Sequence, residues 1–296
     1  MINRLIPPLK ETFYNLKQII FVRAVPSPYH GSKNYQKKNY ARRDKILGII
    51  AVILLWEAFS RSGLVLMSAF PPPSAVIREL IEMFLNPNKR FLWHIAGTLK
   101  RVSMGFAMGT LMALVFGVMA GISDKFNNFV SVVADFLYTI PWILIFSTFL
   151  LLFGLEENMR FYYISFGTFF YAFYIIRIAV REVSSDVKDT LDASRIDGAN
   201  LFQILFYIVF PMRATIFMES IRQGLIAAWQ TTFVAELALV DRGLGFLNQQ
   251  AIDRYLVERN FAIVFLVAIL ALLTLSVPQW LSRLAAKHWS MDDRQI

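Results

Sequence analysis

The sequence predicts an all-α integral membrane protein with about six transmembrane helices, and three observations lead to this class. Of the 296 residues, 56% are hydrophobic and only 17% are charged, whereas about a quarter of a soluble domain is charged. The apolar residues form continuous runs, unlike the alternating segments of about ten residues in transmembrane β-strands. Six runs approach the roughly 20 residues that a spanning helix needs, namely 46–67, 103–122, 130–153, 161–180, 214–235 and 261–281.

Residues 1–45 form a basic segment ahead of the first predicted span. They contain ten Lys or Arg against Glu11 and Asp44, which is +8 of the chain's net charge of +9. A secretory signal would need an uninterrupted apolar core, but the nearest candidate, FYNLKQIIFVRAV, is broken by Lys17 and Arg23. We therefore predict a basic cytoplasmic N-terminal arm over 1–45. It would act as an orientation signal near anionic lipid or, alternatively, as a docking segment for a partner.

The distribution of Lys and Arg predicts the orientation. With the N-terminus in the cytoplasm, 19 of them fall on the cytoplasmic side, 10 fall on the outer side, and Arg222 lies inside the fifth span. Cytoplasmic loops of membrane proteins carry the excess of positive charge. The sequence thus predicts a multi-pass protein with a cytoplasmic N-terminus, a transmembrane domain over 46–283 and a cytoplasmic C-terminal tail over 284–296.

The segment between the first two spans, AFPPPSAVIRELIEMF, predicts a proline-stiffened turn followed by a helix. Ser74 is placed to cap that helix. The apolar side chains of Val76, Leu80, Ile81 and Phe84 are expected on one face. This pattern favours an amphipathic helix that lies at the outer membrane interface.

Two local patterns predict how the first two spans pack. Glu57 and Arg61 are four residues apart, in the order that favours an ion pair on a helix, so we expect a structural pair. The second span contains Gly-xxx-Gly pairs at 105/109 and 117/121, a spacing that lets helix backbones approach closely in a bilayer. We expect these glycines to serve packing within the chain, and a contact between subunits is the alternative.

Polar residues at membrane depth mark a candidate pathway. Such side chains need partners or water, so we expect the third and fifth spans to face the bundle interior or a cavity. A proline at position 141 should kink the third span. Ordinary hydrogen bonding between helices is the alternative role. The candidate pathway-lining residues are Thr139, Pro141, Ser147, Thr148, Arg222, Trp229, Gln230, Thr232 and Glu236.

Residues 182–211, between the fourth and fifth spans, include the polar stretch DASRIDGANLFQILFYIVFP. Serines at 184 and 185 favour a helix start, and Gly198 favours its end. A second short helix is expected from about residue 199 until Pro211. Leu201 and Phe202 would be exposed near the tip of this helix–glycine–helix elbow. An exposed apolar pair on a short helix is typical of a docking surface.

The composition also excludes several kinds of chemistry. The chain has no cysteine, hence no disulfide, thiolate metal site or thiol nucleophile. His30, His94 and His288 are scattered along the chain, so we predict no metal site. The phosphate-binding pattern G-x-x-x-x-G-K-[ST] is absent from the sequence. We therefore expect no ATP hydrolysis by this chain, and nothing in the sequence supports catalysis.

The polar stretch resembles the "EAA" loop of ABC-transporter permeases. That pattern is Glu-Ala-Ala, three residues, Gly and a closing hydrophobic-Pro. It is matched here by Asp192, Ala193, Ser194, Gly198 and, thirteen residues later, Pro211. The chain departs from it with Asp for Glu, Ser for the second Ala, and Phe at 210 where Leu is usual.

Further motifs resemble, in the same order, the nitrate/sulfonate/taurine branch of importer permeases. FPPPSAVIREL is similar to its Pro-Ser-Pro-Ser segment, and His94 with the following TLKRV and GF is similar to its entry into the second span. The pair Ile140-Pro141 followed by FG matches its third span, and Glu236 followed by GLGF matches its Ala-Glu…Gly-Leu-Gly signature. The resemblance runs from about residue 46 to 283 and leaves residues 1–45 outside.

The resemblance implies a type I ABC importer permease of MetI-like architecture in a bacterial inner membrane. It implies a permease homodimer and an extracytoplasmic substrate-binding protein. It also implies a cytoplasmic ABC ATPase dimer, which would bind ATP and Mg and would contact the two elbows. The chain itself would bind no cofactor, its other partner would be membrane lipid, and no nucleic acid is expected. The implied ATPase-coupling residues are Asp192, Ala193, Gly198, Ala199, Asn200, Leu201, Phe202, Gln203 and Pro211.

Two other functional classes are open on the residues alone. A secondary transporter or channel that needs no ATP would use the intramembrane charges of Glu57, Arg222 and Glu236, but the sequence has no visible inverted repeat. A membrane-embedded enzyme would need a cluster of His, Asp or Glu at membrane depth, and none is apparent. The solute would be an anion such as nitrate, sulfonate, taurine or bicarbonate, or a vitamin precursor, and the sequence does not select among these.

Overall fold

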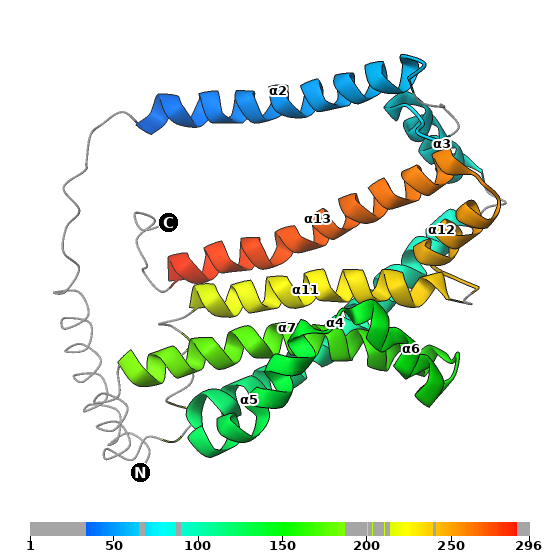
Figure 1. Ribbon diagram of the computed structural model, residues 1–296. Coiled ribbons are helices and arrows are strands. Elements are labelled where there is room, and N and C mark those ends of the chain that lie inside the picture. Colours follow the sequence, from blue (N-terminus) through cyan, green and yellow to red (C-terminus); the bar gives the residue numbers. More distant parts are fainter. Residues whose placement is uncertain are drawn as a thin grey trace, which may run out of the picture. The chain divides into compact units, whose positions relative to one another are not determined.

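The computed structural model describes residues 34–64, 69–86, 90–186, 200, 203, 210, 214–238 and 241–288. All regular structure in these residues is α-helical. The chain divides into two units, Met1–Trp56 and Glu57–Ile296. The helical bundle described below belongs to the second unit (Figure 1).

Helix α2 (Asn34–Arg61) crosses from the first unit into the second. It begins eleven residues before the expected arm ends, so position 45 is not a helix boundary. At its carboxyl end the predicted pair is confirmed, because Arg61 Nε donates to Glu57 Oε1 at 2.6 Å. Ser74 also joins this pair, since its hydroxyl donates to Glu57 Oε1 at 2.8 Å and accepts from Arg61 Nη2 at 3.0 Å.

Helix α3 (Pro73–Leu85) begins two residues earlier than a cap at Ser74 would place it. Pro72 occupies the cap position, and Ser74 makes no capping hydrogen bond, so the cap prediction was wrong. A serine in the first turn is free to bond elsewhere, and here it bonds Glu57 instead. The predicted common face is also split, because Val76 is buried while Ile81 and Phe84 are exposed.

Helices α4 (Phe91–Ile122) and α7 (Glu157–Asp186) form the centre of the bundle. All four glycines of the two Gly-xxx-Gly pairs lie against α7, within the same chain. A Cβ at Gly109 would lie 2.5 Å from the backbone oxygen of Ser165, and a Cβ at Gly117 would lie 2.9 Å from Ile176 Cγ2. The expectation of packing within the chain is therefore confirmed. A larger side chain here would overpack the interface, typically at a cost of about 1–3 kcal/mol.

The third expected span is broken at Pro141. Helix α5 (Asp124–Thr139) and helix α6 (Trp142–Phe153) are bent by 105° across the break. Proline has no N–H for an intrahelical bond and clashes with the preceding turn, which explains the position of the break. We predicted a kinked span, and the structure has a near right angle instead.

The remaining helices are α11 (Ala214–Leu237), α12 (Leu244–Asp253) and α13 (Val257–His288). Helix α11 lies between α7 and α13 (Figure 1). Among the described residues, α4, α7 and α13 are long and apolar enough to cross a membrane, and the bent α5–α6 pair would make a fourth span. The other two expected spans coincide with α2 and α11, and α11 carries Arg222, Gln223 and Gln230.

Buried side chains gather in two clusters along the α4–α7–α11 contact. One contains Ala113, Phe170, Phe173 and Ile176, and the other contains Val102, Tyr163, Leu225 and Trp229, among further members. In contrast, α13 is mostly exposed, with only 22% of its most apolar window buried. Exposed apolar surface of this kind suits a helix that faces lipid.

Candidate functional site

The carboxylate of Glu236, near the carboxyl end of α11, is fully buried at 0% exposure. Its Oε2 accepts hydrogen bonds from the Thr98 hydroxyl at 2.8 Å and from the Gly245 backbone N–H at 3.0 Å. Its Oε1 accepts from Arg101 Nη1 at 2.8 Å. A buried ionised group is tolerated only when it is paired and hydrogen-bonded in this way.

Arg101 connects this carboxylate to a second one. Its Nε and Nη2 donate to the two oxygens of Glu157 at 2.6 and 3.0 Å, and its Nη1 also donates to the Arg242 carbonyl at 2.6 Å. Arg160 lies 3.3 Å from the same Glu157 carboxylate. Two arginines thus balance two glutamates, and we call Arg101, Glu157, Arg160 and Glu236 the Glu236 network.

The end of the loop between α11 and α12, at Gly243, packs closely against the Glu236 carboxyl group. Gly243 has a φ of 137° and a Cβ there would collide with the Glu236 carboxyl group, so only glycine meets both requirements. The N–H of Gly243 donates to His94 Nδ1 at 3.2 Å, and the N–H of Leu244 donates to the Thr98 hydroxyl at 2.8 Å. Side chains of α4 therefore satisfy the backbone donors of this loop.

The network fastens α4, α7 and α11 together at one end of the bundle. This end, where α4 and α13 begin and α11 ends, we call the Glu236 end. The opposite end is where α7 ends at Asp186 and α11 starts at Ala214. The predicted elbow lies between those two residues, so the two features bracket α11. The helix start expected at serines 184 and 185 was wrong, because α7 continues through both.

Apart from Glu236 and the half-buried Arg222, the predicted pathway residues fall into two groups. Trp229 and Thr232 are buried within the chain, and the Trp229 indole N–H donates to the Thr274 hydroxyl at 2.9 Å. The exposed group comprises Thr139 at the end of α5, Pro141 just before α6, Ser147 and Thr148 on α6, and Gln230 on α11. The structure thus does not bring the nine candidates together around one cavity of a single chain.

The intramembrane arginines have carboxylate partners. Arg222 Nη1 lies 3.0 Å from Glu219 Oε1, and Arg177 Nη2 lies 2.7 Å from Asp135 Oδ1. The spacing of three residues could have identified the first pair in the sequence. The second pair joins residues 42 positions apart and has no local signal.

Most of the predicted coupling residues lie outside the described part of the chain: Asp192, Ala193, Gly198, Ala199, Leu201, Phe202 and Pro211. The two that are described form a reciprocal pair. The Asn200 N–H donates to Gln203 Oε1 and the Gln203 N–H donates to Asn200 Oδ1, both at 2.9 Å. This is the geometry of a capping box. It supports the prediction of a helix start near residue 199.

No group of three or more His, Asp or Glu side chains arranged as metal ligands occurs among the described residues.

Comparisons with known proteins match most of the chain. The family model described as "Binding-protein-dependent transport system inner membrane component" matches residues 113–290. The relative SsuC of Bacillus subtilis (strain 168), named for aliphatic sulfonates transport as a permease protein, is 24% identical and covers 83% of this chain and 88% of its own length. The taurine transport system permease protein TauC of Escherichia coli (strain K12) is 25% identical, covering 77% of this chain and 83% of its own.

Two further similarities agree with these. The bicarbonate transport system permease protein CmpB of Synechococcus elongatus is 23% identical over 86% of this chain and 92% of its own length. A chain from an inward-facing structure of the MetNI methionine ABC transporter superposes with a TM-score of 0.54 at 17% sequence identity. The match covers 67% of this chain and 98% of that chain. This last similarity concerns the fold.

Proposed function

The chain belongs to the family of binding-protein-dependent transport system inner membrane components and is the permease of an ABC importer, and we propose that two copies of it form the pathway for a small anion. Sulfonate, taurine and bicarbonate are the solutes in the names of the related permeases, so the proposed class is a small sulfonate or oxoanion. An extracytoplasmic binding protein delivers the solute. The paired states of Arg177 and Arg222 favour selection by that binding protein over selection by a fixed positive charge in the pathway.

The Asn200–Gln203 capping pair is the observation that carries the proposed coupling to an ATPase. The pair favours a helix start at Asn200, in the connection between α7 and α11, and the short helix expected from there would be a rigid element. Residues 199–203 would occupy a groove on a cytoplasmic ABC ATPase. That partner binds ATP and Mg and hydrolyses ATP, and this chain contributes neither a cofactor site nor catalysis.

The Glu236 network supports a rigid-body motion of the bundle. Force applied at the elbow reaches α7 and α11 directly, and the network fastens these two helices to α4 at their far end. ATP-driven approach of the two elbows would then tilt whole bundles instead of bending α11. Such a change requires that the ATPase contacts differ between the two states.

The proposed orientation places the N-terminus and the elbow in the cytoplasm and the Glu236 end outside. The excess of Lys and Arg on the elbow side supports it. The exposed surface of α5 and α6, which includes Phe129, Phe136 and Leu151, would face the second copy and lipid. The exposed polar candidates on α6, Ser147 and Thr148, would line the pathway between the copies.

The double substitution Leu201→Asp and Phe202→Asp tests the coupling. The permease should remain folded, and ATP hydrolysis by the assembled transporter should no longer drive uptake into proteoliposomes. Gln203→Glu is the matched control, because the carboxylate keeps an acceptor for the Asn200 N–H and should leave uptake intact. Undiminished uptake by the double variant would show that the elbow is not the coupling element.

A further inference from the structure

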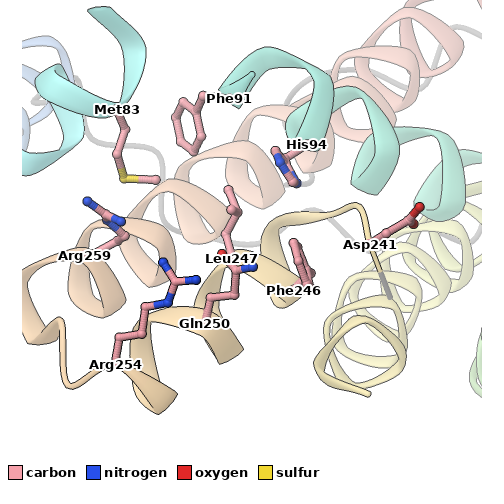
Figure 2. A pocket seen from close by; sticks show the side chains of 9 residues that line it. All are labelled: Met83, Phe91, His94, Asp241, Phe246, Leu247, Gln250, Arg254 and Arg259. Carbon is pink, nitrogen blue, oxygen red and sulfur yellow. The ribbon is translucent and has the colours of Figure 1, made fainter. Parts of the chain in front are cut away.

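A pocket of about 310 Å³ lies at the Glu236 end, where α3, α4, α12 and α13 meet. Figure 2 shows its side chains, with Arg254 and Arg259 at one end and Asp241 at the other. Its volume is at the lower limit of ordinary ligand pockets. The lining residues are Met83, Phe91, His94, Asp241, Phe246, Leu247, Gln250, Arg254 and Arg259.

The arginine end of the pocket has hydrogen-bond donors without partners among the described residues. The Arg254 side chain makes no hydrogen bond or ion pair with the described residues, and the Arg259 side chain uses only its Nε, which donates to Glu79 Oε1 at 2.7 Å. His94 accepts a hydrogen bond at Nδ1, so its neutral form carries the proton on Nε2 and offers a further donor. The side-chain amide of Gln250 adds another donor. This donor set suits an anion with several oxygen acceptors.

The position of the pocket indicates the source of the anion. The apolar stretches of α4 and α13 both begin here, at Phe91 and Val257, so the pocket lies at the depth of the lipid headgroups. Exposed aromatic rings mark the same level, since Trp93 is 41% and Tyr255 is 89% exposed, and such rings concentrate at membrane interfaces.

Helix α3 adds a second indication of lipid contact. Its Met83 lines the pocket, while its other face exposes Ile77, Ile81 and Leu85. A helix with one face packed on the protein and an apolar face uncovered is suited to the boundary between headgroups and acyl chains. Acyl chains of a bound lipid would therefore find apolar surface next to the pocket.

We propose that this pocket binds the phosphate headgroup of an anionic phospholipid, with Arg254 as its main charged contact and Arg259, His94 and Gln250 as further donors. Glu79 balances Arg259, and Asp241 lies at the far end of the pocket, so Arg254 contributes the uncompensated positive charge. A zwitterionic lipid would bring a cation toward the two arginines, whereas phosphatidylglycerol would not. The inference does not depend on the solute or on coupling to an ATPase.

The test measures phosphatidylglycerol retained by the full chain, purified in mild detergent and titrated with the lipid, by native mass spectrometry. Arg254→Gln removes the charged donor, so phosphatidylglycerol binding should weaken by about tenfold or more, as expected for the loss of a hydrogen bond to a charged group. Arg254→Lys keeps the charge and should recover part of that loss. Arg78→Gln is the matched control, because Arg78 is an exposed arginine on α3 outside the pocket lining, and its affinity should stay within about twofold.

Three outcomes would overturn the inference. The first is equal phosphatidylglycerol affinity for Arg254→Gln and the unaltered chain, with both eluting and melting alike. The second is binding of soluble glycerol phosphate, in phosphatidylcholine nanodiscs, as tightly as phosphatidylglycerol, which would identify a site for a soluble anion. The third is an Arg254→Gln variant that retains phosphatidylglycerol but loses affinity for a substrate-binding protein. That result would identify the pocket as a binding site for an acidic side chain of that protein.

Discussion

Glu236→Gln changes one oxygen of a fully buried carboxylate into an NH₂ group while keeping its shape. In the structure both oxygens accept hydrogen bonds, Oε1 from Arg101 and Oε2 from Thr98 and Gly245. Either orientation of the amide therefore sets a donor against a donor. The substitution also leaves Arg101, which is 8% exposed, with Glu157 as its remaining carboxylate.

The expected cost follows from these contacts. Removing one partner of a buried ion pair costs about 3–5 kcal/mol, and the retained contact with Glu157 offsets part of this, so we expect about 3 kcal/mol. For a domain of about 150–250 residues this corresponds to a fall of about 6–12 °C in the melting temperature. Glu157→Gln is the matched control. Its side chain is 60% exposed, so water solvates part of the charge that Arg101 and Arg160 lose, and we expect a smaller cost than for Glu236→Gln.

The assay is the thermal melting of both variants, purified in the same detergent and followed by the loss of monodisperse protein on size exclusion. We expect Glu236→Gln to melt well below Glu157→Gln. Equal melting temperatures for the two variants would refute the reasoning, because the burial of Glu236 would then contribute nothing.

Two further predictions concern the contacts of α7. Gly109→Ala should destabilise the chain by about 1–3 kcal/mol, since the new Cβ meets the Ser165 backbone. Gly48→Ala is the control, because its Cβ would meet nothing within 4 Å, and it should be neutral or stabilising. Thermal melting compares the two variants, and equal effects would count against the close packing of α4 on α7. Asp135→Asn should lower stability by about 1 kcal/mol, because it weakens the half-exposed ion pair with Arg177. In a double-mutant cycle with Arg177→Met, Asp135→Asn should have no further effect on stability.

Local spacing in the sequence predicted the features whose partners are near in the chain. The Glu57–Arg61 pair forms because four residues make one helical turn. The Gly-xxx-Gly pairs pack closely because small residues repeat on one face. The capping bonds of Asn200 and Gln203, which are three residues apart, support the helix start expected after Gly198. In each case the residues involved are only three or four positions apart in the sequence.

Features that depend on distant partners could not be predicted in the same way. Ser74 was expected to cap α3, but Glu57, which lies 17 residues earlier, binds its hydroxyl. Glu236 was expected to line the pathway, whereas it is fully buried and its partner Arg101 is 135 residues away. Proline at 141 indicated a kink, but the angle of 105° depends on how α5 and α6 pack afterwards. Pairings of this kind require the tertiary structure.

The most direct test of the permease account is the composition and activity of the intact complex. The tagged chain should be solubilised gently and co-purifying proteins identified with their stoichiometry, followed by reconstitution and uptake assays. We predict two copies of this 34.0 kDa chain with two copies of a P-loop ATPase, and uptake that requires both ATP and a binding protein. A chain that purifies without an ATPase and transports solute without ATP would contradict the account.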